Sequence, residues 1–296
     1  MKRILLLVGV YVFIVFNAFS QNEKLRKNIA NIVDDKRATV GVALISDRDT
    51  LTFNNDIPYP TMSVYKFHLA LAVLDYMDKN SVPLSQTIHI QQSDLLSNTY
   101  SPLRDAYPDG DISLPISEIL NYTVSKSDNN GCDILFRYLG GTEVVDKYIR
   151  GLGFSDFAIG ATEEQMHSNW TAQYANWSTP LTMALLLEKF RTGSILSLAH
   201  HDFLWDVMVR TTTGTNKIKG LLPEGTIVAH KTGSSFRNAE GLNAADNDAG
   251  IIQLPDGRQY SFVVFVMDSF ESDAVNAKII ADISKAVYDY QMALEL

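Results

Sequence analysis

Hydrophobic positions along the chain follow two different periods, and the change between them divides the sequence into regions. Between Ser63 and about Ser197, apolar side chains recur every three to four residues, which is the spacing of helices that bury one face. Toward both ends they alternate with smaller or polar residues, as on strands at Val40–Leu44, Leu51–Phe53 and Tyr260–Met267. The pattern therefore predicts strands near both ends of the chain and helices between them.

Capping residues mark where several of these elements begin. Thr179-Pro180 places a cap before a proline and predicts a helix that runs to Arg191, and Ser272 predicts the start of a long last helix. Because strands lie at both ends, we expect residues 21–60 and 210–296 to form one α/β lobe with an antiparallel sheet of about five strands and terminal helices. Residues 61–209 are then an inserted all-helical lobe, with an active site between the two lobes.

The first 20 residues have the pattern of a secretory signal peptide. Lys2 and Arg3 precede an apolar run from Ile4 to Phe16, and small residues follow at the expected cleavage site. A membrane anchor is the alternative, but the run is short for a span of about 20 residues. We therefore expect export to the periplasm or medium, no membrane attachment after cleavage, and Gln21 as the first mature residue.

Composition excludes some classes of function. The net charge is −9 and no basic run is present, so nucleic-acid binding is not expected. Cys132 is the only cysteine, which excludes an internal disulfide and is typical of a small buried residue. The six histidines show none of the spacings of a zinc hydrolase, and we predict neither a metal nor another cofactor.

Ser63 and Lys66 are the first residues whose types and spacing indicate chemistry. They follow Pro58 and Pro60, and the apolar spacing from Val64 onward predicts a helix with Ser63 in its first turn and Lys66 on the same face. A serine hydroxyl is a poor nucleophile without a neighbouring base, and both an amine and a helix dipole favour its activation. A helix-terminal serine followed by a solvated lysine explains the pair equally well on its own.

Two more triplets occur further along the chain. Ser127-Asp128-Asn129 lies in a polar break between predicted helices, and Lys231-Thr232-Gly233 follows a predicted strand at Thr226–His230. With Ser63-Val64-Tyr65-Lys66 in front of them, the chain resembles the class A serine β-lactamases and their relatives, the penicillin-binding transpeptidases, over essentially all of residues 21–296. This resemblance implies an α+β fold of two lobes and a serine acyl-enzyme as the intermediate.

The resemblance also implies a role for each motif residue. Ser63 would attack the lactam carbonyl, and either Lys66 or a carboxylate acting through water would take its proton. Ser127 would pass a proton to the leaving nitrogen. Backbone N–H groups of Ser63 and Ser234 would form the oxyanion hole. The remaining motif positions would bind substrate, with Asn129 on the side-chain amide and Lys231, Thr232, Gly233 and Ser234 around the carboxylate.

A glutamate that activates water separates a hydrolase from a transpeptidase in this family. Glu163 and Glu164 compete for that role, and the family's spacing favours Glu163. The run from Glu163 to His167 resembles a cephalosporin-active, extended-spectrum branch of class A. His167 stands where most relatives have an asparagine that helps to hold the water, and we expect it to contact substrate or water.

Three further positions follow from the same resemblance. Tyr100 falls on the loop at the site entrance, where an aromatic ring flanks the substrate, although a surface tyrosine is the alternative. Lys217 falls where many relatives carry an arginine near the substrate carboxylate, and a lysine there keeps the charge but lacks the planar fork. His230 is interpreted as structural.

We therefore expect an enzyme that hydrolyses the β-lactam amide of penicillins and cephalosporins and confers resistance to them. A penicillin-binding peptidase that acts on cell-wall peptides is the main alternative, and a non-catalytic β-lactam sensor is a second. A small β-lactam would be the only partner, and the family's habit favours a monomer.

Overall fold

Five antiparallel strands form the sheet on which the fold is built. The computed structural model describes residues 22–193 and 195–294, so the predicted signal peptide lies outside the described residues. The strand order is β2-β1-β10-β9-β8, and four hydrogen-bonded strand pairs join it. The bounds are β1 Thr39–Ser46, β2 Thr50–Phe53, β8 Val228–Ser234, β9 Asn243–Gln253 and β10 Gln259–Ser269.

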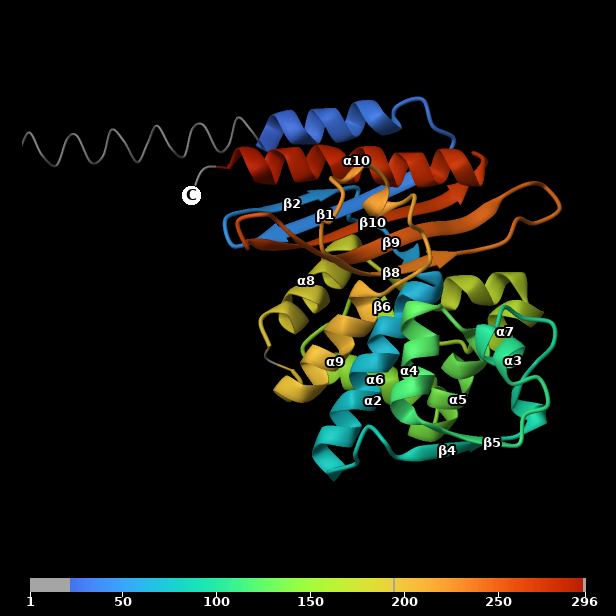
Figure 1. The fold of residues 1–296 in the computed structure, drawn as a ribbon. Coiled ribbons are helices and arrows are strands. Elements are labelled where there is room, and N and C mark those ends of the chain that lie inside the picture. Colours follow the sequence, from blue (N-terminus) through green and yellow to red (C-terminus); the bar gives the residue numbers. More distant parts are fainter. Residues whose placement is uncertain (1–21, 194, 295–296) are drawn as a thin grey trace, which may run out of the picture.

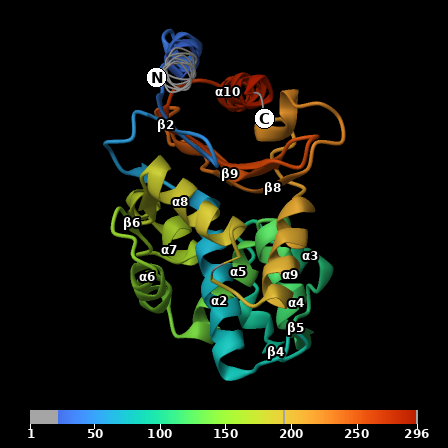
Figure 2. The same ribbon diagram turned by 90° about the vertical axis from the view of Figure 1, so that its left-hand side faces the viewer.

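One face of the sheet is covered by two helices from opposite ends of the chain. Helix α10, Asp273–Ala293, and a helix over residues 22–33 lie side by side on it (Figures 1 and 2). Alternate residues of β1 and β10 point into this layer and form a hydrophobic core with Ile279, Ile283 and Val287 of α10. The side chain of Ser272 caps α10 by accepting from the N–H of Val275, as the sequence predicts.

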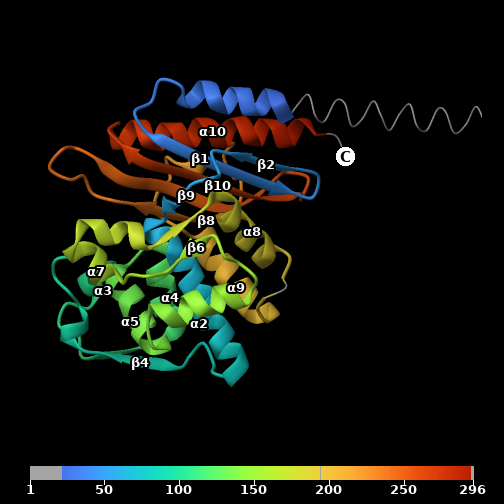
Figure 3. The ribbon, with the colours of Figure 1, turned by 180° about the vertical axis from the view of Figure 1, so that it is seen from behind.

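The other face of the sheet packs on the helical region (Figure 3). Helix α2, Lys66–Asn80, runs through the middle of this region, and ten of its 15 residues are buried. A helix buried on most of its surface is held by all its neighbours and therefore keeps its N-terminal end in a fixed place. The surrounding helices are α3 Pro102–Ala106, α4 Ile116–Ser125, α5 Asn129–Leu139, α6 Thr142–Gly151, α7 Glu163–Ser168, α8 Pro180–Arg191 and α9 Leu198–Val209.

Short elements connect the helices. In the described part of the chain, two small sheets have the orders β3-β7-β6 and β4-β5, and four 3₁₀ helices link longer elements. Their bounds are β3 Tyr59–Pro60, β4 Thr87–Ile90, β5 Ile112–Pro115, β6 Phe157–Ala158, β7 Trp177–Ser178, η1 Met62–Tyr65, η2 Gln92–Asp94, η3 Trp170–Ala175 and η4 Ile218–Leu221. No helix among the described residues has both the length and the apolar character needed to cross a membrane.

The predicted fold class is confirmed, while some predicted boundaries are wrong. The sheet is antiparallel with five strands and is flanked by terminal helices, and the helices α2 to α9 come from the intervening sequence. The strand predicted at Thr226–His230 in fact runs from Val228 to Ser234, so the Lys-Thr-Gly triplet lies within it. The end of this strand lacks the apolar alternation that predicts a strand. Its partner β9 is also polar there, with Asp248, Asn247 and Asp246 opposite Thr232, Gly233 and Ser234.

Candidate active site

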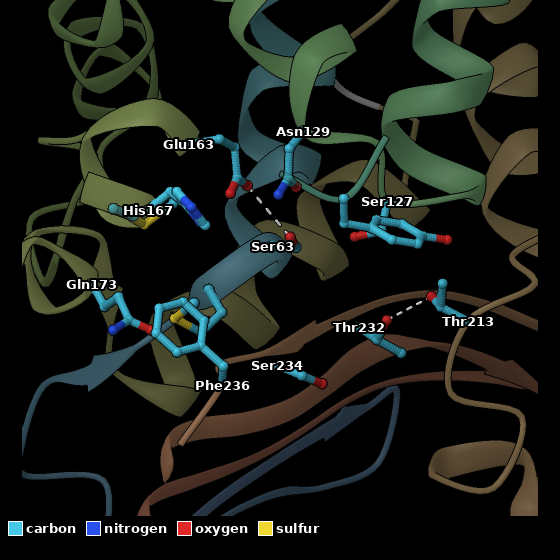
Figure 4. A pocket seen from close by; sticks show the side chains of 13 residues that line it. Ser63, Ser127, Asn129, Glu163, His167, Gln173, Thr213, Thr232, Ser234 and Phe236 are labelled. Atoms are coloured by element: carbon cyan, nitrogen blue, oxygen red, sulfur yellow. Dashed lines mark hydrogen bonds between the residues drawn. The ribbon is translucent and has the colours of Figure 1, made fainter. Parts of the chain in front are cut away.

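A cavity of about 240 Å³ opens between the edge strand β8 and the helical region. Figure 4 shows its lining side chains converging from both parts of the fold. Eight of the residues predicted from the sequence lie on its wall, namely Ser63, Tyr100, Ser127, Asn129, Glu163, His167, Thr232 and Ser234. The others, Lys66, Lys217, Lys231 and Gly233, stand behind the wall, and three of these four are lysines whose amines reach wall residues.

Ser63 sits on the short 3₁₀ helix η1, immediately before α2 begins at Lys66. The predicted position at a helix start is right, but the first turn is a 3₁₀ turn, and its first residue, Met62, has a φ of +45°. Strand β8 approaches this turn closely, since a Cβ on Gly233 would lie 2.4 Å from the carbonyl oxygen of Thr61. A glycine is therefore required for the Lys-Thr-Gly strand to reach the serine.

Lys66 connects three parts of the site. Its side chain is fully buried, and its amine donates to the carbonyl of Ser127 at 2.8 Å and to Oδ1 of Asn129 at 2.6 Å. The same Nζ lies 3.0 Å from Oε1 of Glu163. A buried ammonium is stable only when it is paired and hydrogen-bonded, and these contacts satisfy all three of its N–H donors.

Glu163 and Glu164 differ sharply in position. Glu163 is 7% exposed, and its Oε1 accepts from the hydroxyl of Ser63 at 3.4 Å (Figure 4). Glu164 is exposed and is not among the residues that line the cavity. Both begin helix α7, which Thr162 and Gln165 cap through a reciprocal capping box. Of the two candidates, Glu163 is the one that lies in contact with Ser63.

Asp133 on α5 holds the segment that carries Glu163. Its two carboxylate oxygens accept from the backbone N–H groups of Glu163 and Glu164, each at 2.9 Å. Burial raises the pKa of Asp133 to about 6, and the neighbouring Glu163 adds to the rise, while the N–H donors oppose it. The sequence analysis did not identify this residue, although its place one helical turn after Asn129 puts it on the same side of α5.

Ser127 and Lys231 face each other across the cavity edge. Lys231 is fully buried and donates to Oγ of Ser127 and to the carbonyl oxygen of Thr232, both at 2.8 Å. Burial, and then the nearby positive charge of Lys66, lower the pKa of the Lys231 amine. Ser127 itself has a φ of +59°, so its loop turns the hydroxyl out of the helix register. A proton can therefore pass between this hydroxyl and this amine.

The rest of the Ser-Asp-Asn motif organises the entrance. Asp128 caps α5 through Gly131 and accepts from Ser101 and from the N–H of Leu103, which fixes the loop behind Tyr100. The ring of Tyr100 is 57% exposed and lines the cavity mouth, as predicted for an entrance residue. Asn129 lines the wall, and its Nδ2 donates to Oγ1 of Thr99 at 2.8 Å.

Lys217 lies beneath the carboxylate-binding positions and outside the cavity wall. Its amine donates to Oγ of Ser234 at 2.9 Å and pairs with Asp246 at 2.5 Å, where both side chains are nearly buried. Oγ of Ser234 donates in turn to Asp246 at 2.8 Å, and Thr232 shares a hydrogen bond with Thr213 at 2.6 Å. A negative charge on the substrate would thus meet hydroxyl groups first, with Lys217 behind them.

His167 belongs to an aromatic group at the opposite end of the cavity. Its ring contacts the ring of Phe236 with centroids 6.2 Å apart, and Trp170 contacts the same ring at 5.6 Å. Phe236 is 53% exposed, lines the cavity and lies beside Gln173 in Figure 4. This group joins the β8–β9 turn to the segment after Glu163. The sequence offered no pattern that predicts it.

His230 has the structural position expected of it. It is completely buried, its Nδ1 lies 2.9 Å from Oδ1 of Asp248, and it does not line the cavity.

Comparison with known proteins identifies the relatives of this chain. A model of the Beta-lactamase enzyme family matches residues 24–291. The β-lactamase VEB-1 of Pseudomonas aeruginosa is 45% identical, and the match covers 98% of each chain. The TLA-1 extended-spectrum β-lactamase structure is 51% identical at a TM-score of 0.90, covering 91% of this chain and 99% of that one. A class A β-lactamase structure from Bacteroides cellulosilyticus is 48% identical at a TM-score of 0.89, covering 92% and 98%.

Proposed function

This chain belongs to the class A β-lactamase family and is a serine enzyme that hydrolyses β-lactams, and we propose how its side chains divide the reaction between them. The proposal is that penicillins and cephalosporins are its substrates, and that the reaction passes through an ester on Ser63. The observation that carries it is the contact of Glu163 with Ser63 at 3.4 Å, because a carboxylate at that place can act on water beside an acyl-serine.

Acylation begins when Ser63 loses its proton to Glu163, directly or through water. The Nζ of Lys66 lies 3.0 Å from that carboxylate, and Lys66 is the second base that can take the serine proton, so acylation can proceed without Glu163. As the carbonyl becomes tetrahedral, its oxygen is negative, and the backbone N–H groups of Ser63 and Ser234 stabilise that charge. The lactam C–N bond then breaks, and Ser127 gives its proton to the nitrogen and regains one from Lys231 at 2.8 Å.

Deacylation uses Glu163 a second time. Before this step Glu163 returns the proton from acylation to the solvent, and Lys231 takes one up. The carboxylate then takes a proton from a water molecule, which attacks the ester carbonyl. The C–O bond to Ser63 breaks, Glu163 gives that proton to the serine oxygen, and the opened product leaves. The segment of Glu163 is held by Asp133 through two backbone N–H groups, so the carboxylate stays at a fixed distance from the ester. A penicillin-binding transpeptidase has no such group and remains acylated.

Replacement of Glu163 tests the assignment directly. We expect Glu163→Ala to react with a chromogenic cephalosporin in a single burst and then to accumulate the acyl-enzyme, visible by mass spectrometry as Ser63 plus the substrate. Glu164→Ala is the matched control, since Glu164 is exposed, and it should keep sustained turnover. Accumulation in the Glu164 variant instead, or a burst without turnover in the unaltered enzyme, would contradict the proposal.

We also propose that the protein is exported and acts as a monomer in the periplasm or medium. The basic and apolar pattern of residues 1–20 supports export. N-terminal sequencing of the protein recovered from the periplasm should begin at Gln21, and light scattering should give the mass of one chain. Cytoplasmic protein with an intact N-terminus would contradict the first part, and a dimer would contradict the second.

A further inference from the structure

Tyr65, the residue immediately before α2, places its hydroxyl on the carboxylate that the proposed reaction uses twice. The phenol oxygen donates to Oε1 of Glu163 at 2.9 Å, a shorter contact than that of Ser63 with the same atom, at 3.4 Å. Lys66 reaches this oxygen too, at 3.0 Å. Three donors thus meet at Oε1, and within the described residues no hydrogen bond is found to Oε2, which leaves that oxygen for water.

The Tyr65 side chain is buried, and contacts of both its ring and its hydroxyl hold it in place. It has no exposed surface, its ring stacks on Phe136 of α5 with centroids 5.8 Å apart, and its hydroxyl contacts Sγ of Cys132 at 3.4 Å. Burial raises the pKa of the phenol well above its ordinary value, so the group stays protonated. Since its one proton goes to Glu163, the thiol of Cys132 is the donor in the second contact.

We propose that Tyr65 is a positioning residue for Glu163. Its hydroxyl sets the rotation of the carboxylate so that Oε1 faces Ser63 and Lys66 while Oε2 faces the water. This inference rests on the proposed function of Glu163. The role belongs to the hydroxyl alone, because the packing on Phe136 requires only the ring.

Other charged groups around Glu163 act in the same region and must be held constant. Lys66 on α2 lies in contact with the Glu163 carboxylate. Asp133 on α5 accepts from the backbone N–H of Glu163, and the charge of Glu163 helps to raise the pKa of Asp133. Lys231 on β8 lies further off and also feels the Glu163 charge. A substitution that removes only the phenol oxygen leaves all of these in place.

Tyr65→Phe is therefore the test, and Tyr107→Phe is its control. The hydroxyl of Tyr107 also donates to a glutamate, Glu118, at 3.0 Å, but Tyr107 does not line the cavity. In Tyr65→Phe, we expect the acid limb of the kcat/KM profile to move to higher pH by about one unit, since one hydrogen bond to the carboxylate is lost. We also expect the acyl-enzyme to break down several-fold more slowly, while the rate of its formation changes less.

The outcomes separate the two proposals. An unchanged acid limb and unchanged deacylation in Tyr65→Phe would overturn the role of Tyr65 while leaving Glu163 as the base. The same change in Tyr107→Phe would also overturn it, because the effect would then not come from the site. If Glu163→Ala itself continues to turn over, the proposed function of Glu163 fails first. Thermal unfolding of both variants checks that the fold is retained.

Discussion

Replacement of Asp133 by asparagine removes a charge and one acceptor from the group that holds Glu163. The carboxylate accepts two backbone N–H groups at 2.9 Å, whereas an amide offers one oxygen and turns an NH₂ group toward the second N–H. Either Glu163 or Glu164 then has a backbone donor without an acceptor. Leaving a buried donor unsatisfied costs about 1–3 kcal/mol.

Removal of the charge acts in the opposite direction. Burial and the charge of Glu163 raise the pKa of Asp133 from 3.8 to about 6, so ionisation of this group in the folded state costs about 3 kcal/mol at neutral pH. Asp133→Asn avoids that cost. The two terms are of similar size, and we expect the free energy of unfolding at pH 7 to change by no more than about 2 kcal/mol.

The dependence on pH distinguishes the two terms. Between about pH 4 and pH 6 the folded state binds the Asp133 proton more tightly than the unfolded chain does, so its contribution to stability falls as the pH rises through this range. In Asp133→Asn the amide does not titrate, so this decrease in stability with pH is absent. We therefore expect the free energy of unfolding of the variant, relative to that of the unaltered protein, to rise by about 2–3 kcal/mol between pH 4 and pH 7. Urea unfolding at several pH values measures this difference.

The rate of deacylation in Asp133→Asn should fall even at a pH where the free energy of unfolding does not. With one anchor lost, the start of α7 can shift, and a displacement of about 1 Å at a reacting group costs up to about 100-fold in rate. We expect deacylation at pH 7 to slow at least about tenfold in Asp133→Asn. A stability difference that is constant with pH, together with normal deacylation, would refute the reasoning.

Three further substitutions test other parts of the site. Asp246→Asn should lower the free energy of unfolding by about 3–5 kcal/mol because it leaves buried Lys217 unpaired, and Asp246→Asn with Lys217→Met should recover most of the loss in urea unfolding. Gly233→Ala should remove activity and lower Tm, because its Cβ would meet the carbonyl of Thr61 at 2.4 Å; unaltered kinetics would exclude this clash. Phe236→Ala should change the free energy of unfolding by less than about 1 kcal/mol, since the ring is 53% exposed. It should raise KM for β-lactams that carry an aromatic side chain more than for β-lactams that carry a small one.

The sequence by itself carried the family and the outline of the fold. Three short motifs in a fixed order indicated a serine acyl-transfer enzyme, and helical and alternating periods gave the sheet with its inserted helices. These signals are local, since a period of 3.6 or 2 residues and a capping serine such as Ser272 depend only on neighbours along the chain. Where β8 lost its apolar alternation, the predicted strand was correspondingly displaced.

Which side chains meet was decided only by the tertiary structure. Glu163 and Glu164 are adjacent and identical in type, yet only Glu163 contacts Ser63. The cap of α7 and the hydrogen bonds to Asp133 hold the backbone that gives this orientation. In the sequence Tyr65 is only an inner residue of the Ser63-Val64-Tyr65-Lys66 motif. Its hydroxyl gains importance because Glu163, 98 positions further along the chain, accepts its hydrogen bond. Contacts of this kind depend on how whole elements pack, and no local period in the chain records them.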